Sequence, residues 1–461
     1  MRTLLVNIAR FITALTFVFS GFVKAVDPLG TVYKFQDYAE AVGLAGVFPE
    51  WMLTCAAIIL ALFEFSLGIS LLFAMNRKVT AWLTMVFMAV MTILTIWIYF
   101  ANPVSDCGCF GDALKLTNGQ TLLKNIILSA FSAMILAWHD RMPRLVSHSN
   151  RWIVWHYSSL FIIVVAGYSL YHLPLFDFRP YHIGANIPQG MVIPEDAEQP
   201  EFETTFIMEK DGKRQEFTLE NYPDSTWTFV DSKTIQTKAG YEPPIHDFSI
   251  QRVSDGTDLT DSILTAEGYT FLLISPHLEK ADDSYFGNIN QVCDFALDNG
   301  YGFFCLTASG KDAIERWIDL TGAEYQFCNT DEVTLKTIIR SNPGLLLLKD
   351  GTVKGKWNSR DIPTDEIVHG GKITERSTFM QKEDVTAKKL GIITMWYVLP
   401  LILLALADRL WMWSRWFRAK EDKQKDKLSK LLKNQKQNNG KENCCRQLEN
   451  EQEPAGGRSS R

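Results

Sequence analysis

The sequence predicts a multi-pass α-helical membrane protein that also carries an α/β domain outside the membrane. Runs of about 18 to 22 apolar residues are long enough to cross a bilayer, and six such runs begin near Leu4, Met52, Val79, Thr121, Trp152 and Lys389. Between the fifth and sixth runs, residues 173–387 change character, because short β-like stretches there alternate with helical ones. A chain of 461 residues with 47% apolar content has room for both parts.

The first four apolar runs, within residues 1–142, are joined by short connections and are expected to pack as a four-helix bundle. The fifth spans about residues 150–172 and the sixth about residues 389–410. The first run could instead be a cleaved signal peptide, but Arg10 interrupts it and no A-x-A-like cleavage site follows. We therefore expect it to be a retained helix.

The basic residues of the short loops predict the orientation of these helices. Arg2, Arg77 and Arg141 fall on the same side of a six-helix alternation as the lysine-rich end of the chain. Loops that carry more Lys and Arg face the cytoplasm. Both termini are therefore expected to be cytoplasmic, and the loop 101–120 and the region 173–387 are expected to be periplasmic in a bacterial inner membrane.

The periplasmic region is expected to contain a β-hairpin followed by an α/β domain. Residues 202–219 alternate around Asp211-Gly212, which is typical of a hairpin turn. From about residue 240 to 360, apolar strands alternate with helices and end in a second hairpin at Asp350-Gly351. Such alternation predicts a sheet that is covered on both faces.

The end of the chain, residues 411–461, carries lysines every two or three residues, without a sustained apolar stripe. We expect a basic, solvated cytoplasmic tail, partly helical and otherwise disordered, that solubilises the chain or lies against anionic lipid. Cys444 and Cys445 would be idle thiols in this reducing compartment. The net charge of -6 argues against nucleic acid as a general partner, whereas membrane lipid is an expected one.

The stretch SDCGCFGDAL, Ser105–Leu114, places two cysteines one glycine apart just after the third helix, on the outer side. A disulfide between Cys107 and Cys109 would close a very small ring, and strain of that kind makes a bond easy to reduce. Gly108 removes a Cβ from the tight turn. The pair is the leading candidate for a redox site. The alternatives are a thiolate metal site, although the loop has no histidine to complete a zinc site, and a non-reactive turn or structural bond.

Two residues of the second helix are further candidates. Glu64 lies deep in an apolar run, where an ionisable group is expensive and usually functional. An ion pair with Arg10 or Lys24 would explain Glu64 structurally instead. Cys55, near the outer end of the same helix, is either a resolving thiol for the CGC pair or a packing residue.

Three cysteines of the outer domain are not expected to be catalytic. Cys293 falls on a predicted helix, and Cys305 and Cys328 fall within or beside predicted strands. The last two would either meet as a structural disulfide or remain buried free thiols.

Residues 19–30, FSGFVKAVDPLG, and 62–72, LFEFSLGISLL, resemble the DoxX superfamily, as does the spacing of the four helices. CGCFGD at 107–112 is similar more narrowly to the MauE branch of that superfamily, the methylamine-utilisation membrane proteins. The resemblance covers about the first 140 residues and implies a role in maturing a disulfide-rich periplasmic enzyme. Methylamine itself is not implied, because nothing in the sequence indicates an amine site.

The region from about Pro243 to Trp357 resembles a thioredoxin-like domain of the TlpA or peroxiredoxin kind, through HDFSIQ, YTFLLIS and NPGLLLLKDGTVKGKW. The resemblance implies a cis peptide bond before Pro343. Where that family has C-x-x-C after the central strand, this chain has SPHLEKA at 275–281, so the usual dithiol is missing. The two halves together resemble uncharacterised membrane proteins of Bacteroides-type bacteria.

These observations lead to a hypothesis of envelope thiol–disulfide chemistry or exported-protein maturation, with Cys107 and Cys109 as the redox pair of a thiol–disulfide oxidoreductase. A quinone could accept the electrons, no other cofactor is expected, and a periplasmic client protein is the expected partner. One alternative is a non-enzymatic scaffold whose redox-silent thioredoxin-like domain binds a periplasmic partner. The other is transport of a small solute or ion around Glu64.

Overall fold

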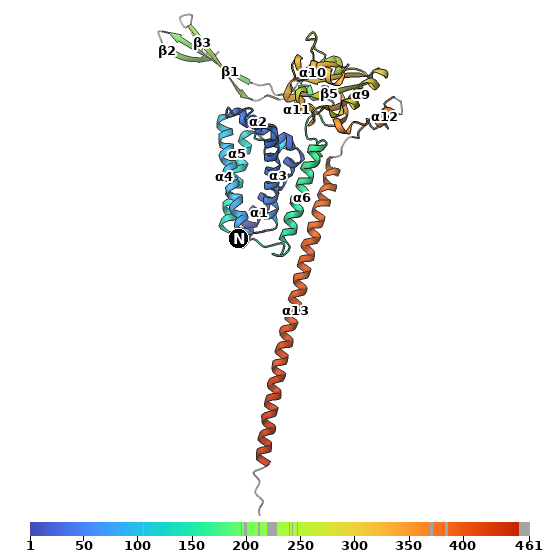
Figure 1. Ribbon diagram of the computed structural model, residues 1–461. Helices are drawn as coiled ribbons and strands as arrows, with labels where there is room; N and C mark the ends of the chain where they lie inside the picture. The colour runs from blue at the N-terminus through green and yellow to red at the C-terminus, as the bar shows by residue number, and fades with distance from the viewer. Residues whose placement is uncertain are drawn as a thin grey trace, which may run out of the picture.

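The computed structural model describes residues 1–104, 106–194, 196–197, 201–210, 213–218, 228–238, 240–241, 243–246, 248–368, 372–382 and 386–450. Within these residues, six helices are long and apolar enough to cross a membrane. This number agrees with the prediction, and the chain is a multi-pass membrane protein. An α/β domain lies beyond one end of the helices (Figure 1).

The spanning helices are α1 (Arg2–Val26), α3 (Glu50–Leu72), α4 (Arg77–Ala101), α5 (Asn118–Ala137), α6 (Arg151–Tyr171) and the apolar part of α13 (Thr386–Asn450). Helices α1, α4 and α6 finish at the same end of the bundle. We call this end the disulfide end, because the CGC loop follows α4 there. The α/β domain lies at this end, and the N-terminus lies at the other (Figure 1).

Helices α1 and α3 approach each other closely because glycines stand at their contact. A Cβ on Gly21 would lie 2.6 Å from the backbone nitrogen of Phe65, and a Cβ on Gly68 would lie 2.8 Å from that of Val18. Small residues of this kind allow close helix packing in membranes. The close approach brings the last two turns of α1 against the middle of α3.

A short helix, α2 (Pro28–Ala41), covers the disulfide end of the bundle (Figure 1). This helix was not predicted, since only a short connection was expected between the first two apolar runs. Its start is nevertheless encoded, because the Asp27 carboxylate accepts a hydrogen bond from the Gly30 amide at 2.9 Å and Pro28 occupies the first helical turn.

Helix α13 is a single helix of 65 residues. Near its start, Tyr397 stacks on Phe161 of α6 with ring centroids 4.4 Å apart, and lower down Asp408 accepts a hydrogen bond from the Ser147 amide at 2.6 Å. The helix then continues well past the bundle (Figure 1). The helix includes residues 411–450 of the lysine-rich end of the chain. A helix that is already nucleated in the apolar span extends readily through Lys, Glu, Gln and Leu, which all favour helix.

In the described part of the α/β domain, six strands form one mixed sheet in the order β4-β7-β6-β5-β8-β9. The strands are β4 (Gln251–Arg252), β5 (Tyr269–Ser275), β6 (Gly302–Thr307), β7 (Gln326–Asn329), β8 (Gly344–Lys349) and β9 (Thr352–Asn358). Strands β5, β6 and β7 are parallel, whereas β8 runs antiparallel to both β5 and β9. The hairpin between β8 and β9 turns at Asp350 and Gly351, both with positive φ, as the Asp-Gly pattern predicts.

The helices around this sheet are α7 (Ile187–Met191), α8 (Thr260–Leu264), α9 (Phe286–Asp298), α10 (Lys311–Thr321), α11 (Glu332–Ile338) and α12 (Asp365–Val368). Short 3-10 turns are η1 (Gly111–Ala113), η2 (His139–Arg141), η3 (Leu278–Lys280), η4 (Asp283–Tyr285) and η5 (Ser359–Asp361).

Both faces of the six-stranded sheet are buried, as predicted. Phe271 and Leu273 of β5 belong to one apolar cluster, and Leu272 and Ile274 belong to the other. The register pairs Leu306, not Cys305, with Cys328. Neighbouring residues of a strand point to opposite faces, so Cys305 and Cys328 lie in different clusters as free thiols. The alternative of a structural disulfide between them is wrong.

A separate sheet has the order β2-β1-β3. Strands β1 (Glu201–Lys210) and β2 (Lys213–Thr218) pair antiparallel with Lys210 opposite Lys213, which confirms the predicted hairpin, although the turn at 211–212 lies outside the described residues. Strand β3 (Thr228–Lys238) was not predicted and pairs with the other side of β1.

A candidate redox site at the disulfide end of the bundle

The two cysteines of the CGC loop are joined by a disulfide bond. Both are buried, at 7% and 9% exposure, beside Ile98 of α4 and Val104. Gly108 between them has a φ of 65°, a conformation in which an L side chain is strained. The sequence therefore folds this loop into a tight turn with the bond facing inwards.

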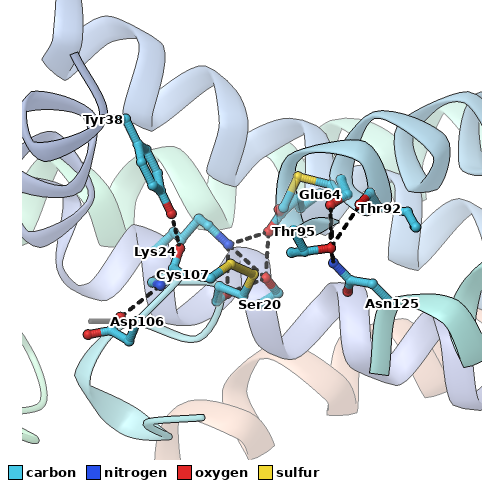
Figure 2. The surroundings of a disulfide bond; sticks show 12 residues. Ser20, Lys24, Tyr38, Glu64, Thr92, Thr95, Asp106, Cys107 and Asn125 are labelled. Carbon is cyan, nitrogen blue, oxygen red and sulfur yellow. Dashed lines mark hydrogen bonds and ion pairs between the residues drawn. A yellow bond between two sulfur atoms is a disulfide. The ribbon is translucent and has the colours of Figure 1, made fainter. Parts of the chain in front are cut away.

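A hydrogen-bonded network of charged and polar groups lies next to the loop (Figure 2). The Lys24 ammonium of α1 donates to Glu64 Oε2 of α3 at 2.9 Å, to Ser20 Oγ at 2.7 Å and to the carbonyl oxygen of Cys109 at 2.8 Å. Ser20 Oγ also lies 2.7 Å from Glu64 Oε2 and 2.8 Å from the same carbonyl oxygen. The network thus links a buried ion pair to the backbone of a disulfide cysteine.

Glu64 is therefore paired with Lys24 and not with Arg10, the other partner that the sequence allowed. Arg10 is buried toward the opposite end of the bundle, where its guanidinium donates to the carbonyl oxygens of Pro143 and Leu72. A buried charge is tolerated where a counter-charge and further hydrogen bonds satisfy it. The Lys24–Glu64 pair meets that condition with side-chain exposures of 5% and 3%.

Helix α2 and the start of the loop hold the other cysteine. The Tyr38 hydroxyl donates to the carbonyl oxygen of Cys107 at 2.7 Å, and burial raises the pKa of this phenol, so it stays protonated. Asp106 accepts from the Gly108 amide at 2.8 Å and pairs with Lys34 of α2 at 3.2 Å. The carbonyl oxygen of each disulfide cysteine is thus held by a hydrogen bond, that of Cys109 from α1 and that of Cys107 from α2.

A cavity of about 340 Å³ lies between the bundle and the α/β domain. Lys24, Asp106 and Gly108 line it from the bundle, and Arg340 lines it from the α/β domain. The cavity therefore reaches the CGC loop at Gly108, between the two disulfide cysteines.

Arg340, just after α11, joins the α/β domain to the loop. Its Nε lies 2.9 Å from Asp27 Oδ2, and its terminal nitrogen lies 3.2 Å from Asp112 Oδ2, three residues beyond Cys109. The guanidinium also donates to the Lys336 carbonyl oxygen and packs over the Tyr33 ring. We call Arg340, Asp27 and Asp112 the interdomain clasp.

The remaining cysteines are separate from this site. Cys55 lies on the exposed face of α3, outside the buried cluster around the disulfide. Burial raises the pKa of Cys293 and of Cys328 to about 11, and it also raises that of Cys305. These thiols of the α/β domain are therefore protonated at neutral pH and poor nucleophiles. The side chains of Cys444 and Cys445 lie outside the described residues.

The end of β5, where the sequence has SPHLEKA, carries polar contacts in place of thiols. Ser275 Oγ donates to Asn342 Oδ1 at 2.6 Å, and a nitrogen of the His277 ring lies 2.9 Å from Glu332 Oε1. The peptide bond between Asn342 and Pro343 is cis. Among all described residues, no group of three or more His, Cys, Asp or Glu side chains is placed to hold a metal ion.

Sequence reasoning missed Ser20, Tyr38 and the interdomain clasp. Ser20 could have been found, because it precedes Lys24 by four residues in FSGFVK and so shares a helix face with it. Tyr38 and Arg340 carry no local signal, since their partners are distant in the sequence: Cys107 is 69 residues from Tyr38, and Asp27 is 313 residues from Arg340.

Two parts of the chain match known families. Residues 202–239, in the separate sheet, match a domain of unknown function (DUF8463). No curated protein and no solved structure matches the chain. Residues 2–139 match the family described as methylamine utilisation protein MauE. The part of the chain that holds the CGC loop, Lys24 and Glu64 is therefore similar to MauE.

Proposed function

We propose that the chain is a bacterial inner-membrane protein of envelope thiol–disulfide chemistry, which exchanges its Cys107–Cys109 disulfide with cysteines of an exported client. The observation that carries the proposal is the position of this disulfide, above a buried Lys24–Glu64 pair and beside an open cavity. The similarity of this part to MauE supports a function at the membrane. Methylamine is not proposed as a ligand.

The exchange would proceed in two steps. A client thiolate attacks one sulfur of the pair, the Cys107–Cys109 bond breaks, and a mixed disulfide forms. The second client thiol then displaces the cysteine, so that the client gains a disulfide while two electrons pass to Cys107 and Cys109, and the two protons of the client thiols are either bound by the pair or released to water. An acceptor then reoxidises Cys107 and Cys109 to the disulfide and takes up two electrons and two protons. We propose a quinone, which becomes a quinol, because a quinone dissolves in the same membrane.

The proposed orientation places the disulfide end and the α/β domain in the periplasm and both termini in the cytoplasm. The support is the Lys and Arg content of the loops at the opposite end, such as Arg77 and Arg141. An oxidising compartment is also where a disulfide persists.

The α/β domain is proposed to be thioredoxin-like and redox-silent, and to hold the client near the loop. The support is a central strand β5 flanked by parallel β6 and antiparallel β8, in a mixed sheet that is covered on both faces. The SPHLEKA segment supplies no thiol there, so the reactive pair of the whole chain would be the one in the CGC loop.

A second candidate function is a non-enzymatic scaffold, and the burial of the disulfide favours it. A bond that is less than one-tenth exposed could serve only to hold the loop for Asp112 to meet Arg340. The α/β domain would then bind a periplasmic partner, with the bundle as its anchor.

Capture of mixed disulfides separates the two candidates. In cells that produce the Cys107→Ser or the Cys109→Ser variant, the remaining thiol should accumulate in a disulfide-linked complex that dithiothreitol releases. Cys444→Ser is the control and should behave as the parent chain. The proposal fails if both single variants carry only a free thiol and retain full function, which is the result that the scaffold predicts.

A further inference from the structure

We infer that Lys24 stabilises the thiolate of Cys109 when the pair is reduced, and that Glu64 balances the charge of Lys24 when the pair is oxidised. This inference rests on the proposed thiol–disulfide exchange and assigns the two buried charges a role within it.

The geometry places the Lys24 ammonium next to Cys109. All three of its N–H groups are used, because it donates to Ser20 Oγ, to Glu64 Oε2 and to the Cys109 carbonyl oxygen. The carbonyl oxygen and Sγ of one residue are separated only by the carbonyl carbon, Cα and Cβ. The ammonium that contacts this oxygen therefore lies near the sulfur of the same residue, and a nearby opposite charge favours the ionised form of a thiol.

Burial strengthens the electrostatic interaction between Lys24 and Cys109. The Lys24 and Glu64 side chains are 5% and 3% exposed, and charges interact more strongly there than at a water-exposed surface. The structural reading, in which the pair only ties α1 to α3, explains the Lys24–Glu64 contact. It gives no reason for Lys24 and Ser20 both to converge on the backbone of a disulfide cysteine.

The charges of the site change with its redox state. In the disulfide form, Lys24 and Glu64 neutralise each other. When a client dithiol reduces the pair, the client gives up two protons: one passes to Cys107, Cys109 remains a thiolate, and the other proton is released to water. Lys24 then faces two negative groups, the thiolate and Glu64. The positive charge favours the reduced form, whereas the Glu64 charge disfavours it.

Other charged and titratable groups also face the loop, and they are the same in every variant proposed below. They are Lys34, Tyr38 and Asp27 of α2 and its cap, Asp106 and Asp112 of the loop, Lys124 of α5, whose Nζ lies 4.3 Å from the Phe110 ring centroid, and Arg340. The comparison between variants therefore isolates Lys24 and Glu64.

The test is the redox equilibrium of the purified full chain with glutathione at pH 7, with the Cys107–Cys109 state read by alkylation and mass spectrometry. Lys24→Met should shift the ratio of disulfide to dithiol toward the disulfide by about tenfold or more, since a change of one unit in the pKa of a thiol corresponds to a tenfold change in an equilibrium constant. Glu64→Gln keeps the shape of the side chain and should shift the pair the opposite way. Lys24→Arg should restore most of the parent ratio, and Lys78→Met, an exposed charge at the opposite end, should leave it unchanged.

A double variant excludes misfolding as the cause. Lys24→Met with Glu64→Gln has no unpaired buried charge, and it should still favour the disulfide relative to the parent. In a Cys107→Ser background, alkylation of Cys109 should also move to higher pH by about one unit when Lys24 is Met.

Different results would overturn the role of Lys24 and Glu64 and the proposed thiol–disulfide exchange. If the parent pair equilibrates with glutathione but Lys24→Met, Glu64→Gln and the double variant all stay within threefold of it, the inference is wrong and the exchange stands. A parent pair that remains a disulfide at every glutathione ratio overturns the proposed exchange and the inference with it.

Discussion

Lys356 in β9 is buried as deeply as Lys24 in α1, at 5% exposure each, and it is satisfied in the same manner. It donates to Asp177 Oδ2 at 2.6 Å and to the carbonyl oxygens of Tyr181 and Ile338. Arg179 also pairs with Asp177, at 2.8 Å. Burial alone would raise the pKa of Asp177, but the charges of Lys356 and Arg179 hold it well below its usual range.

This pairing predicts a pH-dependent cost for Asp177→Asn. A carboxylate with a lowered folded-state pKa stabilises the fold above its unfolded pKa of about 4, and this contribution is lost as the pH falls toward the folded value. The variant should lose on the order of 3 kcal/mol at pH 7, because two buried cations lose their partner, and the difference should shrink below about pH 4. Thermal unfolding of the full chain across pH measures it. Asp319→Asn, on the exposed face of α10, should have no effect, and a pH-independent difference would contradict the assignment.

At the scale of elements, the contact of α1 with α3 sets the site, because it brings Lys24 within reach of Glu64. Gly21→Ala would place a Cβ 2.6 Å from the Phe65 nitrogen and 2.8 Å from the Ala61 carbonyl oxygen. These are backbone atoms that cannot move aside. The variant should lower stability by about 1–3 kcal/mol and loosen the Lys24 network.

The matched control is Gly167→Ala in α6, where a new Cβ meets nothing within 4 Å. It should leave the thermal midpoint unchanged or raise it slightly, since Ala favours helix over Gly. Equal thermal midpoints for the Gly21 and Gly167 variants would show that the α1–α3 approach is not what holds the bundle.

Elements with a strong local pattern could be predicted from the sequence, and their tertiary partners could not. The six apolar runs and the strands at 269–275 and 344–357 follow from hydrophobic length and periodicity. Helix α2 was missed because its apolar pattern is weak, although Asp27-Pro28 is a typical helix start. The Glu64–Lys24 pair was one of two alternatives, and only the packing of α1 on α3 decides between them.

At the scale of the whole molecule, the interdomain clasp couples the α/β domain to the disulfide loop. Arg340 is 7% exposed and holds Asp27 at the end of α1 and Asp112 beyond Cys109. The α/β domain therefore lies over the disulfide loop, with the cavity of about 340 Å³ between them.

Loss of the clasp should expose the disulfide. Arg340→Ala leaves the Asp27 and Asp112 carboxylates without their guanidinium partner. Removing one partner of a buried ion pair costs more than about 1.4 kcal/mol, the free energy that corresponds to a tenfold change in an equilibrium constant. Reduction of the Cys107–Cys109 bond by dithiothreitol in the full chain should become at least about tenfold faster. Arg316→Ala, an exposed arginine of α10, should reduce at the parent rate. An unchanged rate for Arg340→Ala would mean that the α/β domain does not control access.

The central claim is that Cys107 and Cys109 act together and cycle between disulfide and dithiol. Alkylation trapping of the full chain in living cells tests this cycling. Cells are exposed in turn to an oxidant and a reductant, and the alkylating reagent adds a fixed mass for each free thiol. The account predicts that the pair moves between the two states and that the Cys107→Ser and Cys109→Ser variants each lose function, whereas Cys444→Ser does not. A pair that stays in one state under both conditions, together with a fully functional double serine variant, would contradict it.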